Sequence, residues 1–325
     1  MGDAMLARQD TNAHMPSTHP LAAVDLGSNS FRLEIGLRTD QGFERSDYFK
    51  ETVRLGGGLD ARGDLMPEAM QAGWDCLKRF GRRLKGFGAH QVRAVATQTL
   101  REARNRNIFL GRAQVLLGFP IDVISGDQEA QLIYRGVASH LQAPQERRLV
   151  LDIGGRSSEI IIGQGEQVQW LRSLALGSVA WSQQYFSNGR FTTQAFVRAD
   201  TAARALIQQQ IDPEERPQWD LAYGAAGTVN AVVDVLAQNG WDADQITPAA
   251  LEWLSTELLR AGRVDHLTLP GLRADRKPVI GGGLSLLRAM MDVLGIDVLT
   301  HTTAGLRHGL LQSMIDPSTR QASAP

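Results

Sequence analysis

The sequence holds a single cysteine and no long apolar run. One thiol cannot close an intrachain disulfide, and Cys76 lies close to Trp74 and Leu77 in a segment with helical periodicity, so we expect a buried, unreactive side chain. Residues 1–20 mix charged side chains with prolines and contain no apolar core of the kind that a signal peptide or a membrane span requires. Together these absences favour a cytoplasmic protein without a membrane partner.

An excess of charge of one sign is also missing. The chain has 34 Lys and Arg against 35 Asp and Glu, which gives a formal net charge of −1. This balance creates no global attraction to nucleic acid, so a site for a polyanion has to be a local basic patch. The seven histidines show no metal-ligand spacing, which argues against a histidine-based metal centre.

Two segments of the chain repeat one pattern: an apolar strand, an aspartate, a Gly/Ser turn and a second strand. The copies are Asp25-Leu-Gly-Ser-Asn-Ser30 and Asp152-Ile-Gly-Gly-Arg-Ser-Ser158, each preceded by an apolar run. Turns of Gly, Ser and Asn can point successive backbone N–H groups into one concavity and bind an anion there. The two copies therefore predict a phosphate clamp, and a length of 325 residues suits two related domains.

The residues after the first turn show which kind of loop this is. Phe31, Leu33 and Ile35 alternate with Arg32 and Glu34, which is the period of a strand. A P-loop or a dinucleotide-binding fingerprint needs its glycine turn to open a helix, so both are disfavoured. Elsewhere the pattern predicts helices over 67–85, 108–117 and 127–137, a helix-rich region over 193–210, and strands over 92–97, 121–124 and 221–223. This alternation predicts an α/β protein with two similar halves around a cleft.

Further short motifs extend from about residue 21 to residue 311. They are a glycine turn at 224–228, Arg54-Leu-Gly, Ala94-Val-Ala-Thr97, Leu100-Arg-Glu-Ala103, Ile124-Ser-Gly-Asp-Gln-Glu-Ala130, Ser157-Ser-Glu159, Leu176-Gly-Ser178, Pro270-Gly-Leu272 and Gly305-Leu-Arg307. The hairpins and the glycine turn resemble the phosphate and adenosine loops of actin, sugar kinases and heat-shock chaperones. More narrowly, the whole set resembles the exopolyphosphatase/guanosine pentaphosphate phosphohydrolase family, in its short two-domain form.

This resemblance implies two actin-like (ASKHA, ribonuclease H-like) α/β domains around an interdomain cleft. We expect the first domain over 20–135, completed by a C-terminal helix at 304–316, and the second over 136–303. Disordered tails are expected at 1–19 and 317–325.

The resemblance also implies an activity. In that family the enzyme removes a terminal phosphate from inorganic polyphosphate, or the 5′-phosphate from pppGpp, with a divalent cation and a water nucleophile. We therefore expect an exopolyphosphatase that uses Mg²⁺, with Mn²⁺ as the alternative, and polyphosphate or (p)ppGpp as its partner; a homodimer stays open. The alternatives are a pppGpp 5′-phosphohydrolase that produces ppGpp, a non-catalytic polyphosphate or alarmone sensor, and an ATP-dependent kinase.

The resemblance places the catalytic glutamate at Glu129, where a carboxylate could take the proton of an attacking water. Its alternative interpretation is an acid in the first turn of a helix that interacts with the macrodipole. Asp152 and Glu159 are the candidate ligands of Mg²⁺, which usually takes one or two carboxylates, and Asp25 is the equivalent of Asp152 in the first copy. Without a metal, Asp152 would be a turn aspartate and Glu159 a solvated strand residue.

Donors to phosphate oxygens are expected from the two turns and from arginines in the family motifs. These residues are Gly27, Ser28, Asn29, Ser30, Arg32, Arg54, Thr97, Arg101, Gly154, Gly155, Arg156, Ser157 and Ser158.

Two positions depart from the family, which usually has glycine at both. At Arg156 a positive φ would cost about 1–2 kcal/mol, and the guanidinium must leave the cleft or join it. We expect Arg156 to contact phosphate and to favour polyphosphate over pppGpp. At Ala226 the added methyl group is expected to disfavour a nucleotide base.

Overall fold

The computed structural model describes residues 19–39, 42–141 and 145–315. The predicted tails lie outside these residues, apart from His19. None of the helices in these ranges has the length and the apolar composition that crossing a membrane requires.

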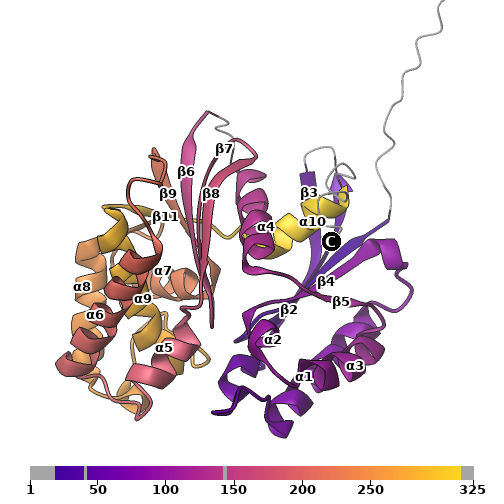
Figure 1. The fold of residues 1–325 in the computed structure, drawn as a ribbon, viewed down its shortest axis with the longest axis horizontal. Helices are drawn as coiled ribbons and strands as arrows, with labels where there is room; N and C mark the ends of the chain where they lie inside the picture. Colours follow the sequence, from indigo (N-terminus) through magenta and orange to yellow (C-terminus); the bar gives the residue numbers. More distant parts are fainter. Residues whose placement is uncertain (1–18, 40–41, 142–144, 316–325) are drawn as a thin grey trace, which may run out of the picture.

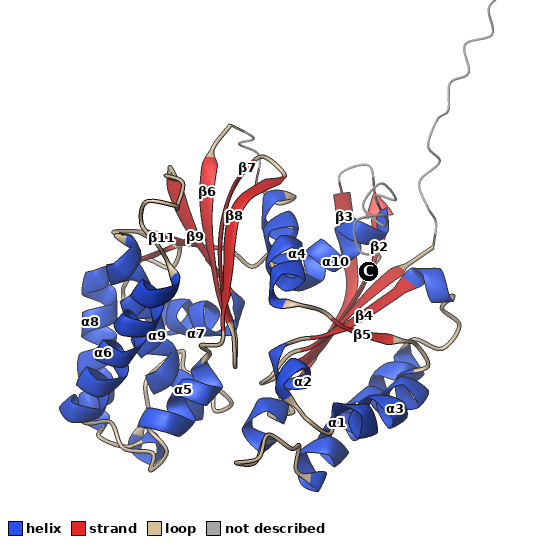
Figure 2. Ribbon diagram, viewed as in Figure 1, coloured by secondary structure: helices blue, strands red, loops and turns tan. Residues whose placement is uncertain are grey.

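Two mixed β-sheets form the framework of the molecule (Figures 1 and 2). The strands of the first sheet are β1 (Leu21–Leu26), β2 (Phe31–Thr39), β3 (Gly42–Glu51), β4 (Val92–Ala96) and β5 (Ile121–Val123). Those of the second are β6 (Arg147–Ile153), β7 (Ser158–Gln164), β8 (Gln167–Leu174), β9 (Leu221–Ala225), β10 (Gln245–Ile246) and β11 (Leu299–His301). We call the parts built on the first and the second sheet the first and the second domain.

The two sheets repeat one topology. The first has the strand order β3-β2-β1-β4-β5, and the second contains the same order as β8-β7-β6-β9-β11, with β10 added at its edge. In each sheet the strand that ends at the repeated aspartate pairs antiparallel with the next strand and parallel with a later one. This confirms the predicted pair of actin-like α/β domains. It also confirms that both Gly/Ser turns connect the strands of a hairpin.

Helices cover the outer faces of both sheets (Figure 1). On the first domain they are α1 (Pro67–Arg83), α2 (Gln98–Glu102) and α3 (Arg106–Leu117), with a 3₁₀ turn η1 (Leu55–Gly58). On the second they are α5 (Ser178–Tyr185), α6 (Thr193–Gln210), α7 (Ala226–Gln238), α8 (Pro248–Ala261) and α9 (Ile280–Leu294). Short 3₁₀ turns lie at Ala89–Gln91, Val264–His266 and Lys277–Val279. Cys76 lies on the buried face of α1, and burial raises the pKa of its thiol, as expected for an unreactive cysteine.

Two helices lie between the sheets: α4 (Gly126–Ala138) and α10 (Leu306–Ile315) (Figure 1). One apolar cluster joins them to both domains, with Val95 from the first sheet, Ile161 from the second, and Ile133 and Leu310 from the two helices. The last helix thus returns from the second domain to pack on α4 and β1. Close packing of these buried side chains holds α4 and α10 in place between the two sheets. The candidate site residues lie next to these helices.

Candidate active site

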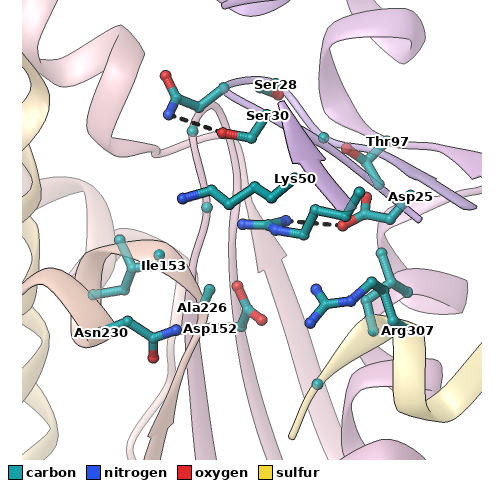
Figure 3. Close-up of a pocket in the computed structure, with 18 of the residues that line it drawn as sticks. Asp25, Ser28, Ser30, Lys50, Thr97, Asp152, Ile153, Ala226, Asn230 and Arg307 are labelled. Carbon is teal, nitrogen blue, oxygen red and sulfur yellow. Dashed lines mark hydrogen bonds and ion pairs between the residues drawn. The ribbon is translucent and has the colours of Figure 1, made fainter. Parts of the chain in front are cut away.

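A cavity of about 310 Å³ opens where the two hairpin turns face each other (Figure 3). The turns approach closely, because a side chain on Gly155 would come within 2.9 Å of Cβ of Ser28. Backbone bonds hold both turns: the N–H of Gly56 donates to Ser28 O at 2.8 Å, and that of Val179 donates to Gly155 O at 2.8 Å. These carbonyl oxygens are therefore engaged elsewhere and are not presented to an anion in the cavity.

Most of the predicted site residues line this cavity. They are Asp25, Gly27, Ser28, Asn29, Ser30, Arg32, Thr97, Glu129, Asp152, Gly154, Gly155 and Ser157. The structure thus brings the first and second turns, the strand end at Thr97 and the start of α4 into one space.

The two hairpins differ in the charge of the residue that lies across from the repeated aspartate. In the first, Asp25 lies directly across from Arg32, and their side chains form an ion pair of 2.9 Å. In the second, Asp152 lies directly across from Glu159, so that two carboxylates share one face of the sheet. The first aspartate is therefore neutralised by its neighbour, whereas the second adds to a negative centre.

Glu129 belongs to this negative centre. It stands in the first turn of α4 but is only 7% exposed, and Nη1 of Arg101 donates to its Oε2 at 2.8 Å. Asp127 in the same turn is exposed, so it is the residue to which the macrodipole interpretation applies. Burial, assisted by the charges of Asp152 and Asp25, raises the pKa of Glu129 to about 7. A carboxylate with a pKa near neutrality is well suited to accept a proton from water.

The same physical causes act on the second hairpin. Burial and the charge of Asp25 raise the pKa of Asp152 to about 7. Glu159 is 1% exposed, and burial together with Glu129 and Asp152 raises its pKa well above the usual range, although Ser173 Oγ donates to it at 2.9 Å. Glu159 itself does not line the cavity.

These carboxylates fit a hard cation. Bringing three buried acids together is unfavourable unless a positive charge compensates them, and oxygen ligands are those that Mg²⁺ prefers. Within the described ranges no group of three or more His, Cys, Asp or Glu side chains has the arrangement of a metal-ligand cluster. The protein could therefore supply one or two carboxylates, chiefly Asp152 with Glu159 beside it, and leave the other positions to water and phosphate.

Four further cations, which were not among the predicted site residues, also line the cavity. They are Lys50 on β3, Arg273 and Arg276 before α9, and Arg307 on α10. Figure 3 shows Asp152 in the middle of the space, with Lys50 and Arg307 on different sides of it. Only Arg307 lay within a family motif, and Arg273 directly follows another. Lys50 and Arg276 come from distant segments, and no local sequence pattern predicts them as site residues.

The cationic side chains lie close enough to repel one another. Burial and the charges of Arg276 and Arg273 lower the pKa of Lys50 to about 8, even though Asp275 lies 3.4 Å from its Nζ. Burial, followed by the charge of Arg32, lowers the pKa of Arg276 to about 10. Asp275 lies within 3.8 Å of Lys50, Arg273 and Arg276 and offsets part of this repulsion. The remaining positive charge suits a multivalent anion.

Five predicted residues lie outside the cavity lining: Arg54, Arg101, Arg156, Ser158 and Glu159. The hydroxyl of Ser158 donates a hydrogen bond to Leu176 O, and the backbone N–H of Arg54 donates one to Asn29 O. The guanidinium of Arg156 leaves the cavity and pairs with Glu102 of the first domain at 2.6 Å. The phosphate contact expected of Arg156 stays a prediction, and in this structure its guanidinium is engaged by the first domain.

Arg156 does not have the positive φ that was considered for it, whereas Arg54 and Ala226 do. Among the residues that the structure describes, the non-glycine residues with positive φ are Arg54 and Ala226. Ala226 has φ 66°, opens α7 directly after β9 and lines the cavity. A methyl group in this conformation costs about 1 kcal/mol.

Comparison with known proteins places these features in a family. A model of the Ppx/GppA phosphatase family matches residues 40–317. The chain is similar to the Ppx/GppA enzyme of Aquifex aeolicus, with 25% identity, a TM-score of 0.73, and coverage of 90% of this chain and 99% of that one. It is also similar in fold to an exopolyphosphatase from Cytophaga hutchinsonii, with 22% identity, a TM-score of 0.82, and coverage of 92% and 98%.

Proposed function

Because the chain belongs to the Ppx/GppA phosphatase family, we propose that it is an exopolyphosphatase, which hydrolyses the terminal phosphoanhydride of inorganic polyphosphate with the aid of Mg²⁺. The observation that carries the proposal is one cavity that is lined both by buried carboxylates and by several cations. Lys50, Arg273 and Arg276 suit the phosphates of a chain, and Glu129 and Asp152 suit the reaction at its end.

Each residue has a defined task in this reaction. Glu129 accepts a proton from water as the water oxygen attacks the terminal phosphorus, and the bridging P–O bond breaks to release phosphate and a shortened chain. Arg101 holds the Glu129 carboxylate at 2.8 Å. The N–H groups and hydroxyls of the two turns bind the terminal phosphate. Asp152 and Glu159 would hold Mg²⁺, which neutralises charge on the phosphate oxygens when bound.

A comparison of substrates tests the proposal. We expect purified protein to release phosphate from long-chain polyphosphate with a higher kcat/KM than from pppGpp or ATP, and to lose this activity with excess EDTA. The cationic cluster supports a repeating polyanion, and the methyl group of Ala226 reduces the space for a base. A higher kcat/KM with pppGpp than with polyphosphate would identify the protein as a pppGpp phosphohydrolase instead. Binding of polyphosphate or pppGpp without release of phosphate would identify it as a non-catalytic sensor.

Lys50 provides a test of the binding mode. Because its pKa is lowered to about 8, it is charged below that pH and loses its charge above it. We expect kcat/KM for polyphosphate to fall by about 5-fold as the pH rises from 7 to 9, which is the effect of one partly solvated charge contact. Steady-state assays at constant ionic strength measure this fall.

The variant Lys50→Met should have a low kcat/KM at pH 7 and should lose the decrease above pH 8. Lys85→Met, which removes an exposed lysine after α1, is the matched control and should keep the wild-type profile. An identical decrease in wild type and Lys50→Met would assign the pH effect to another group.

A further inference from the structure

Arg156 crosses from the second hairpin turn to the first domain. Its Nε donates to Oε2 of Glu102 at 2.7 Å, and its Nη1 donates to Gly56 O at 3.0 Å. The side chains of Arg156 and Glu102 are 18% and 28% exposed, so the pair is largely shielded from water. Gly56 makes room for this contact, because a Cβ there would lie 2.8 Å from Cδ of Arg156. The contact is therefore well defined and does not belong to a mobile surface pair.

The other oxygen of Glu102 continues the contact along α2. Gln98, Arg101 and Glu102 have the spacing that places side chains on one face of a helix. Nε2 of Gln98 donates to Oε1 of Glu102 at 2.7 Å, and Nε of Arg101 donates to Oε1 of Gln98 at 2.8 Å. Each polar atom of Gln98 and each oxygen of Glu102 thus has a partner within one chain of side-chain hydrogen bonds.

The chain of hydrogen bonds ends at Arg101, which contacts the candidate base Glu129. Its Nη1 donates both to Ile124 O and to Oε2 of Glu129, each at 2.8 Å. A guanidinium is planar, so fixing Nε through Gln98 also fixes the direction in which Nη1 points. The orientation of the Glu129 carboxylate therefore depends on contacts that begin in the other domain.

We propose that Arg156 is a positioning residue for hydrolysis, which through Glu102, Gln98 and Arg101 orients the Glu129 carboxylate when the second hairpin turn is seated on the first domain. The proposal rests on the proposed function, since it assigns an origin to the orientation of the base. It differs from the phosphate contact expected from the sequence, because here Arg156 acts on the rate of the chemical step and not on the binding of substrate.

We call the series Arg156, Glu102, Gln98 and Arg101 the relay. Steady-state and single-turnover kinetics with long-chain polyphosphate test it. We expect Arg156→Gln, Glu102→Gln and Gln98→Leu each to lower kcat by about 5- to 20-fold, with KM changed less than about 2-fold, as for couplings carried by side-chain networks. The double variant Arg156→Gln/Glu102→Gln should lose no more than either single variant, because both changes break the same link. Gln98→Leu is informative, since it leaves the Arg156–Glu102 pair in place.

The matched control is Gln183→Leu. Nε2 of Gln183 donates to Gly57 O at 3.3 Å, so this variant removes another contact between α5 and the same turn of the first domain without touching the relay. It should keep the wild-type kcat. Melting temperatures of all variants, measured in parallel, show whether each one is folded.

The possible results separate the relay from its rivals. A raised KM in Arg156→Gln with no effect of Gln98→Leu would overturn the relay and restore a phosphate contact. Equal losses in Arg156→Gln and Gln183→Leu, with full kcat in Gln98→Leu, would overturn it in favour of a simple brace between the domains. Full kcat in all relay variants of an active enzyme refutes the relay alone, whereas a wild-type protein that releases no phosphate overturns the proposed function together with it.

Discussion

Glu129→Gln is expected to lower kcat for phosphate release from polyphosphate by about 10²- to 10⁴-fold, which is the usual contribution of general base catalysis. Glutamine keeps the shape of the side chain and an oxygen that can accept the 2.8 Å hydrogen bond from Arg101, but it cannot take a proton from water. The variant should therefore fold normally and bind polyphosphate with a Kd close to that of the wild type. Rapid-quench assays and equilibrium binding measure the two quantities.

Asp127→Asn is the matched control for this variant. Both changes remove one acid from the first turn of α4, but Asp127 is exposed whereas Glu129 is buried at the cavity. Asp127→Asn should keep its activity, since only the interaction with the helix dipole is weakened. Normal turnover by Glu129→Gln, or an equal loss in Asp127→Asn, would contradict the assignment of the base.

Asp152→Asn is expected to remove the stabilisation of the fold by Mg²⁺. In the wild type at pH 8, Mg²⁺ at about a hundred times its Kd should add about 2.7 kcal/mol to the free energy of unfolding, which corresponds to about 5 °C in Tm. Asp152→Asn should show little of this shift and should lose most phosphate release. Thermal unfolding with and without Mg²⁺ measures the effect independently of turnover.

The pH dependence of the metal-free protein has a defined sign. The pKa of Asp152 is raised to about 7 in the folded state, above the ordinary carboxyl value of about 4. Its contribution to stability is therefore complete at low pH and is lost as the pH rises through about 7. We expect the metal-free wild type to melt at a lower temperature at pH 8 than at pH 6, and Asp152→Asn to show a smaller difference.

Asp25→Asn separates the two hairpins. Asp25 is held by Arg32 at 2.9 Å, whereas Asp152 faces Glu159, so most of the Mg²⁺ shift should remain when Asp25 is replaced. A shift that survives in Asp152→Asn, or that disappears only in Asp25→Asn, would place the cation at the first hairpin.

Local patterns were sufficient to predict the hairpins. The alternation of Phe31, Leu33 and Ile35 is imposed by the pleat of a strand, and these residues are buried in the first sheet as expected. The predicted helix-rich region 193–210 is one helix in the structure, α6, and the side chain of Thr192 caps its first turn. Such features depend on neighbours within a few residues, which the sequence contains directly.

The other half of the site depends on tertiary structure. Lys50 and Arg276 come from segments that no short-range rule connects, and only the packing of the two domains brings them to one cavity. Arg156 shows the same limit, because its partners in the first domain determine where its guanidinium goes. The burial of Glu159 also depends on tertiary structure. Its position on a strand left open whether it was solvated, and packing of β8 and α4 against β7 buries it.

In the proposed reaction, water activated by Glu129 attacks the terminal phosphorus of polyphosphate. Hydrolysis of polyphosphate in oxygen-18-labelled water, followed by mass spectrometry of the released phosphate, tests it most directly. We expect one labelled oxygen in each phosphate released by the Mg²⁺-loaded wild type, and release slowed by about 10²- to 10⁴-fold in Glu129→Gln. Unlabelled phosphate, or labelled phosphate released equally well by Glu129→Gln, would contradict it.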